Sequence, residues 1–201
     1  FYNNSSDKRK VKLYEYKKWN NKRLIGIDGS FLNLPTSEEI KGIYNIKRNK
    51  DSELPACLAS FAYDVLNDMT INATFGVIQG EKEFIINEHI DKLGDRDIVL
   101  MDRAYADYSL MSLLMSKKID FVIRIKTKST NKEIYSFLDS GKKSDIVMMK
   151  CTQGQKKFVE KNNLPKEIKV RLVRIELDTG ETEVLVTTLF DETIEEMNYL
   201  Y

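Results

Sequence analysis

Apolar and polar positions alternate in the first part of the chain in a way that predicts β-strands. Residues 24–28 form a short apolar run that ends at Asp28. Gly29 then predicts a turn, and residues 31–34 alternate as a returning strand would. Residues 35–53 are mostly polar and predict a loop.

Two further strands are predicted at 58–66 and 70–78, where β-branched and aromatic side chains gather. Asn67 and Asp68 supply the turn between them. The first part of the chain therefore predicts three antiparallel strands in a meander.

The apolar spacing then changes to that of helices alternating with strands. Residues 81–93 and 106–118 have apolar side chains three or four positions apart, as in helices. Residues 97–101 are a continuous apolar run, typical of a strand buried on both faces, and 120–126 alternate as a strand. The order β-β-β-α-β-α-β predicts an α/β fold of the ribonuclease H-like class, with a mixed sheet.

The last third of the chain departs from this order. Residues 127–169 are rich in lysine, whereas 169–177 and 181–190 predict a β-hairpin. A helix begins in 191–201, with Asp191 or Thr193 as its cap. We therefore predict four parts: a lead-in segment (1–21), a ribonuclease H-like core (22–126), a β-rich insertion (127–190) and the start of a final helix (191–201).

Composition narrows the class of protein. The chain has 201 residues, 42% of them hydrophobic and 31% charged, and its two cysteines and single histidine cannot form a disulfide framework or a four-ligand zinc site. It has no apolar run long enough to span a membrane. We expect a cytoplasmic protein with no membrane partner.

The net charge of +1 conceals strong patterning along the chain. Residues 51–116 carry a net charge of −8, between blocks of +7 and +8. An acidic centre between basic blocks suits an enzyme that binds metal cations centrally and a polyanion around them. Solvated surface lysines are the simpler alternative.

Two aspartates directly follow predicted buried strands, namely Asp28 after 24–27 and Asp102 after 98–101. In this fold class the first and fourth strands are neighbours, so the two carboxylates would converge. Paired carboxylates repel, and Mg²⁺ or Mn²⁺ relieves that repulsion. Taken singly, Asp28 could instead form a turn, and Asp102 could cap a helix or pair with Arg103.

These residues lie in longer motifs that resemble those of a known family. LIGIDGSFLNLP (24–35) is similar to the first signature of insertion-sequence DDE transposases of the IS-four type. DIVLMDRAYADYSLMSLLMSKKIDFVIRIK (97–126) resembles their second signature, and SFAYDVLN (60–67) and the Glu81-x6-Glu88-His89 spacing fit one branch. EEMNYLY (195–201) resembles the opening of the third signature, whose metal-binding Glu would fall about seven positions after Tyr201.

The resemblance implies DNA cleavage and strand transfer at the ends of an insertion sequence. It implies a three-carboxylate centre with two Mg²⁺ or Mn²⁺ ions, in which Asp28 bridges both ions and Asp102 binds one. The implied partners are DNA, as element ends and target, and a second copy of the protein in the DNA complex. Because the third carboxylate is not in the sequence, we expect this chain to cleave DNA weakly or not at all.

Other residues support this prediction to a lesser degree. Arg103 and Tyr105 match the second signature and would support Asp102 or contact DNA, although ion pairing or packing would explain them equally well. Arg124 and Lys126 would touch phosphates unless they lie on a solvated strand face, and Lys128 would line DNA from the insertion or be plain surface. His89 is better explained as a buried, hydrogen-bonded histidine than as a ligand.

Two other functions remain open from the sequence. One is another nuclease on the same fold, such as a resolvase or repair nuclease. The other is a catalytically inactive DNA-binding or assembly remnant of a transposase, which the missing glutamate favours for this polypeptide.

Overall fold

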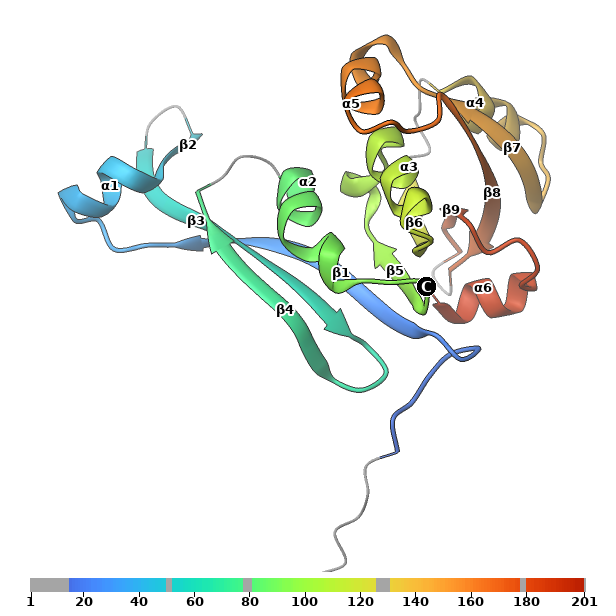
Figure 1. The fold of residues 1–201 in the computed structure, drawn as a ribbon, viewed down its shortest axis with the longest axis horizontal. Coiled ribbons are helices and arrows are strands. Elements are labelled where there is room, and N and C mark those ends of the chain that lie inside the picture. Colours follow the sequence, from blue (N-terminus) through green and yellow to red (C-terminus); the bar gives the residue numbers. More distant parts are fainter. Residues whose placement is uncertain (1–14, 50–51, 78–80, 126–130, 178–179, 201) are drawn as a thin grey trace, which may run out of the picture.

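The computed structural model describes residues 15–49, 52–77, 81–125, 131–177 and 180–200. These residues form a nine-stranded mixed sheet with the strand order β2-β3-β1-β5-β6-β9-β8-β7, and β4 pairs with β3. Helices cover parts of both faces (Figure 1). The strands are β1 (Arg23–Asn33), β2 (Asn45–Asn49), β3 (Ser52–Asp64), β4 (Met69–Gly76), β5 (Asp97–Met101), β6 (Asp120–Ile125), β7 (Ser144–Lys150), β8 (Glu167–Glu176) and β9 (Thr182–Thr187).

The helical segments connect these strands. They are α1 (Glu38–Tyr44), α2 (Glu81–Phe84), α3 (Tyr108–Ser116), α4 (Lys132–Asp139), α5 (Lys156–Lys161) and α6 (Ile194–Leu200). A π-helical turn, η1 (Ile85–His89), and a 3₁₀ turn, η2 (Ile90–Lys92), continue α2. Two more 3₁₀ turns are η3 (Arg103–Tyr105) and η4 (Gln153–Gln155). No helix among the described residues is long and apolar enough to cross a lipid bilayer.

The predicted ribonuclease H-like arrangement is present in the strands β4-β3-β1-β5-β6. β1, β3 and β4 pair antiparallel, and β5 and β6 extend the sheet parallel to β1. The left-handed backbone of Asp68, with φ of 52°, lies in the predicted turn between β3 and β4. The fold class predicted from the hydrophobic pattern is therefore confirmed.

The prediction of a turn at Gly29 is wrong. β1 runs without interruption through Gly29, so residues 31–33 continue the strand instead of returning along it. β3 pairs with β1 from Ile25 to Asn33, and this continuous partner outweighs the local preference of glycine for turns. Glycine suits the position because a Cβ there would lie 3.3 Å from Leu58 Cδ1 and 3.5 Å from Tyr105 Oη.

The polar stretch 35–53 is also more ordered than predicted, because it contains α1 and β2. β2 pairs with the first part of β3, which extends well beyond the predicted start of that strand. β2 forms because β3 offers its backbone groups as hydrogen-bond partners. The local composition of residues 45–49 does not indicate this pairing.

The predicted hairpin near the C-terminus is confirmed as β8 and β9, but it does not stand apart from the sheet. β9 pairs antiparallel with β6, so β9, β8 and β7 extend the sheet beyond the ribonuclease H-like strands. α4, β7 and α5 form in the lysine-rich stretch, which was assigned to a β-rich insertion without any individual helix or strand being predicted.

Two apolar clusters hold the helices against the sheet. On one face, Ile25, Val99 and Phe121 pack with α3 and η1, and all three side chains are fully buried. On the other face, Leu24, Ile98 and Val122 pack with Met197 and Leu200 of α6. Thr193 caps α6, because its hydroxyl accepts from the Glu196 N–H while the Glu196 carboxylate accepts from the Thr193 N–H. The α6 face is the one that carries the candidate site.

Candidate active site

The strand register brings Asp28 and Asp102 to the same level of the sheet. β1 and β5 are parallel neighbours, and the last pair in their ladder is Gly26 with Leu100. Asp28 and Asp102 each follow two residues later, so both side chains project from the same face. Neighbouring strands lie about 4.8 Å apart, which sets the scale of their separation.

The sequence predicted that Asp28 lies at the end of a strand, and this prediction is wrong. Asp28 lies in the middle of β1, paired with Phe61 of β3, whereas Asp102 directly follows β5. The site forms because β5 ends while β1 continues, which leaves one edge of Asp28 open. The Asp28 side chain is exposed, and its Oδ1 accepts the Gly29 N–H at 2.8 Å.

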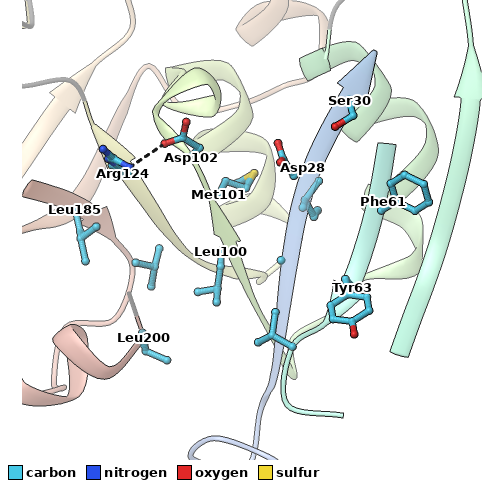
Figure 2. A pocket seen from close by; sticks show the side chains of 14 residues that line it. Asp28, Ser30, Phe61, Tyr63, Leu100, Met101, Asp102, Arg124, Leu185 and Leu200 are labelled. Carbon is cyan, nitrogen blue, oxygen red and sulfur yellow. Dashed lines mark ion pairs between the residues drawn. The ribbon is translucent and has the colours of Figure 1, made fainter. Parts of the chain in front are cut away.

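An open cavity of about 590 Å³ lies in front of the two carboxylates. Figure 2 shows Asp102 between Asp28 and Arg124 along its upper edge. The rest is lined mainly by apolar side chains of the sheet and by Leu200 of α6, together with Ser30 and Tyr63. The Asp102 side chain is 51% exposed. Both carboxylates are therefore accessible to a ligand in the cavity.

Arg124 on β6 continues the same row across the sheet. The ladder between β5 and β6 ends with Met101 beside Ile123, so Asp102 and Arg124 follow at one level. Arg124 Nη1 lies 3.7 Å from Asp102 Oδ1, and Nη2 lies 2.5 Å from Glu183 Oε1. The guanidinium thus sits between two carboxylates, and its side chain is only 25% exposed. Arg124 does not lie on a solvated strand face.

Glu183 is a residue that sequence reasoning missed. It lies on β9 on the same face as Leu185, and its side chain is 11% exposed. The sequence did contain a signal for it, namely a glutamate at a core-facing position of an otherwise apolar strand. Such a glutamate needs a charged or hydrogen-bonding partner. The partner comes from β6, 59 residues earlier, which the local pattern could not indicate.

The other predicted residues fall in different surroundings. Arg103 is exposed beside Asp102. Tyr105 is 1% exposed and its ring packs in the core, so packing accounts for this position. Lys126 and Lys128 lie outside the described residues. His89 is fully buried and hydrogen-bonded to Ser60 and Asn72, in agreement with the structural explanation.

The donor set fits a hard divalent cation. Mg²⁺ and Mn²⁺ prefer oxygen ligands, and Mg²⁺ is commonly held by one or two carboxylates together with water and substrate phosphates. Asp28 and Asp102 supply two accessible carboxylates at one level of the sheet. The described residues contain no group of three or more acidic, histidine or cysteine side chains that could hold a metal. Water and DNA oxygens are the natural further ligands, as in other Mg²⁺ sites held by one or two carboxylates.

Removing the positive charge of Arg124 is expected to affect metal and DNA in opposite directions. Arg124→Gln should strengthen Mn²⁺ binding severalfold, because a cation no longer competes for Asp102. It should weaken DNA binding and reduce the slope of log affinity against log salt by about one, if Arg124 contacts a phosphate. Titrations of Mn²⁺ and of labelled DNA at several salt concentrations measure both. The double variant Arg124→Gln/Glu183→Gln controls for the charge left unpaired on Glu183, and weaker Mn²⁺ binding in both variants would refute the competition.

Comparison with known proteins supports the fold and leaves the family open. No protein-family model matches the sequence, and no curated protein matches it. Among solved structures, the chain is similar to piggyBac transposase, described as a synaptic complex with hairpin DNA, with a TM-score of 0.51 and 17% identity. The match covers 85% of this chain but only 34% of that one, so this chain spans about a third of the piggyBac chain. At this identity the likeness shows a shared fold alone.

Proposed function

We propose that this chain is the catalytic core of a DDE transposase of the IS-four type, which cuts and joins DNA strands at the ends of an insertion sequence. The observation that carries the proposal is the placement of Asp28 and Asp102 at one level of neighbouring parallel strands, facing an open cavity. The signature motifs around both residues and the fold shared with piggyBac transposase support it. DNA is the proposed partner, and pairing of two element ends suggests a homodimer on DNA.

Asp28 and Asp102 are the residues that would hold Mg²⁺ or Mn²⁺ in this proposal. Such ions lower the pKa of bound water and neutralise charge on a phosphodiester in the transition state. The role of the protein is to hold the two carboxylates in place and to leave open positions for DNA oxygens. Asp28 lies on the continuous strand β1, so it is held by the ladder with β3 on one side while its other side is open to the site.

Two arginines have distinct proposed roles. Arg103 is exposed next to Asp102, where its guanidinium can bind a DNA phosphate. Arg124 is held by Glu183, so its position is fixed before DNA arrives. A guanidinium fixed at the rim of the site orients a phosphate at little cost in conformational entropy.

A second candidate function is a DNA-binding or assembly remnant without catalysis. The absence of a three-ligand acidic cluster among the described residues favours it for this polypeptide. In this case DNA would still bind, but metal ions would not couple to it.

Coupling between Mn²⁺ and DNA tests the proposed function without requiring turnover. Divalent cations normally weaken DNA binding by screening, so tighter binding in Mn²⁺ indicates a shared site. We expect 1 mM Mn²⁺ to raise the affinity for a labelled DNA duplex about tenfold in the wild type, measured by fluorescence anisotropy.

The variants Asp28→Asn and Asp102→Asn should lose this increase. Asp95→Asn is the matched control, because Asp95 is an exposed aspartate before the opposite end of β5 and should leave the increase intact. If Mn²⁺ weakens DNA binding equally in all four proteins, the proposed catalytic function is wrong and the remnant is favoured.

A further inference from the structure

A chain of hydrogen-bonded side chains lies behind Asp28, on the face of the sheet opposite the cavity. His89 is 0% exposed and Ser60 is 2% exposed. His89 Nδ1 lies 3.0 Å from Asn72 Nδ2, and His89 Nε2 lies 2.9 Å from Ser60 Oγ. Ser60 Oγ in turn donates to the backbone carbonyl of Asp28 at 3.3 Å. Polar side chains this deeply buried cost free energy unless their hydrogen bonds are satisfied, and here each partner satisfies the next.

The donors and acceptors in this hydrogen-bond network follow from the contacts of Asn72. The amide nitrogen of Asn72 also lies 2.8 Å from the Glu88 carbonyl, which can only accept. The Asn72 NH₂ group therefore donates to the carbonyl and to His89 Nδ1, so Nδ1 must accept. The ring proton is then on Nε2 and is donated to Ser60 Oγ. The Ser60 hydroxyl is left to donate its own proton to Asp28.

Local backbone geometry brings His89 to this position. His89 is the last residue of the π-helical turn η1, which interrupts the helical segment after α2. A π-helical turn changes the direction in which the following side chains project, and such turns are frequent at functional sites. Burial lowers the pKa of His89, which keeps the ring neutral and able to accept from Asn72.

The hydrogen-bond network ends at Asp28, the residue whose position matters most to the proposed chemistry. β5 ends before the level of Asp28, so a backbone ladder to β5 cannot hold this part of β1. Ser60 is the register partner of Gly29, and its side chain lies on the buried face while that of Asp28 lies on the cavity face. The hydroxyl therefore holds β1 from behind without occupying the site.

We propose that Asn72, His89 and Ser60 are positioning residues that fix the backbone of Asp28 and thereby its carboxylate for divalent metal binding. This inference rests on the proposed function, because it takes the Asp28 carboxylate to be a metal ligand. Groups behind a metal ligand commonly change metal affinity 10- to 100-fold when removed.

The test measures Mn²⁺ affinity by water-proton relaxation in five variants of the whole protein, one of which is Asp28→Asn. Ser60→Ala and His89→Leu should each weaken Mn²⁺ binding about tenfold. His89→Gln should recover most of the affinity, because the glutamine amide can donate to Ser60 Oγ. Ser112→Ala is the matched control, since Ser112 is fully buried and its hydroxyl has no hydrogen-bond partner among the described residues. It should bind Mn²⁺ like the wild type.

A spectroscopic readout separates positioning from general stability. The carbonyl ¹³C resonance of Asp28 should shift in Ser60→Ala and His89→Leu and return toward the wild-type value in His89→Gln. If His89→Leu does not fold, Ser60→Ala, which removes a single oxygen atom, still decides the outcome.

Three outcomes would overturn the inference. Wild-type Mn²⁺ affinity and an unshifted Asp28 resonance in Ser60→Ala would show that the hydroxyl does not position Asp28. Equal losses in Ser60→Ala and Ser112→Ala would show a general effect of buried serines. Unchanged Mn²⁺ binding in Asp28→Asn would overturn the metal site of the proposed function, and the inference with it. If Asp28→Asn loses Mn²⁺ binding while Ser60→Ala and His89→Leu keep it, the metal site stands and only the inference fails.

Discussion

Replacement of Asp28 or Asp102 by asparagine is expected to weaken Mn²⁺ binding by about 100-fold or more. Asparagine keeps the size of the side chain but removes the negative charge, and hard divalent cations depend on anionic oxygen ligands. Because the two carboxylates lie at one level of neighbouring strands, each should contribute to the same site. Isothermal titration calorimetry of the wild type and both single variants measures the effect.

The double variant sharpens this prediction. If both side chains bind the same ions, Asp28→Asn/Asp102→Asn should bind hardly more weakly than either single variant, because residues that share one ligand are not additive. Two independent, weak cation sites would instead leave each single variant with one site of unchanged affinity, and only the double variant would lose both. Full retention of Mn²⁺ affinity in either single variant would contradict the assignment of that residue.

Breaking the ion pair between Arg23 and Asp97 should destabilise the protein by about 3 kcal/mol in the variant Asp97→Asn. Arg23 Nε lies 2.5 Å from Asp97 Oδ1 and Nη2 lies 2.7 Å from Oδ2, and the Asp97 side chain is 2% exposed. The Gly94 N–H also donates to Asp97 at 2.8 Å. Loss of the negative charge leaves the guanidinium without its anionic partner. Urea denaturation measures the change in free energy of unfolding.

This ion pair also links stability to the site. Arg23 and Asp97 are register partners at the start of β1 and β5, and five residues later come Asp28 on β1 and Asp102 directly after β5. The exposed pair of Lys117 and Asp91 provides the control, since solvent screens this pair and Asp91→Asn should cost far less than Asp97→Asn. Equal destabilisation by Asp97→Asn and Asp91→Asn would show that burial of the Arg23 pair has no special importance.

The central strands and the two aspartates could be predicted because their signals are local. The apolar runs 24–27 and 98–101 each stop at an aspartate, and the order of strands and helices fixes which strands are neighbours. Parallel pairing then puts the aspartates at one level once the register is known. The register itself was not predictable, since it depends on contacts such as that between Arg23 and Asp97.

Features that depend on distant partners escaped prediction. Gly29 has the composition of a turn, but the long pairing with β3 keeps it in an extended strand. The role of Glu183 depends on its ion pair with Arg124 on the adjacent strand β6, which the sequence around Glu183 does not indicate. Likewise, His89 was expected to be buried and hydrogen-bonded, but its connection to Asp28 runs through Ser60 on β3, a strand on which sequence reasoning identified no polar role.

Anomalous X-ray diffraction from crystals grown in Mn²⁺ tests the central claim most directly. A peak at the Mn²⁺ absorption edge, within coordination distance of both the Asp28 and Asp102 carboxylates, is the expected result, and it should vanish in crystals of Asp28→Asn. Peaks confined to other acidic side chains, such as Asp91 and Asp95 near the opposite end of β5, would contradict a shared metal site between the two aspartates.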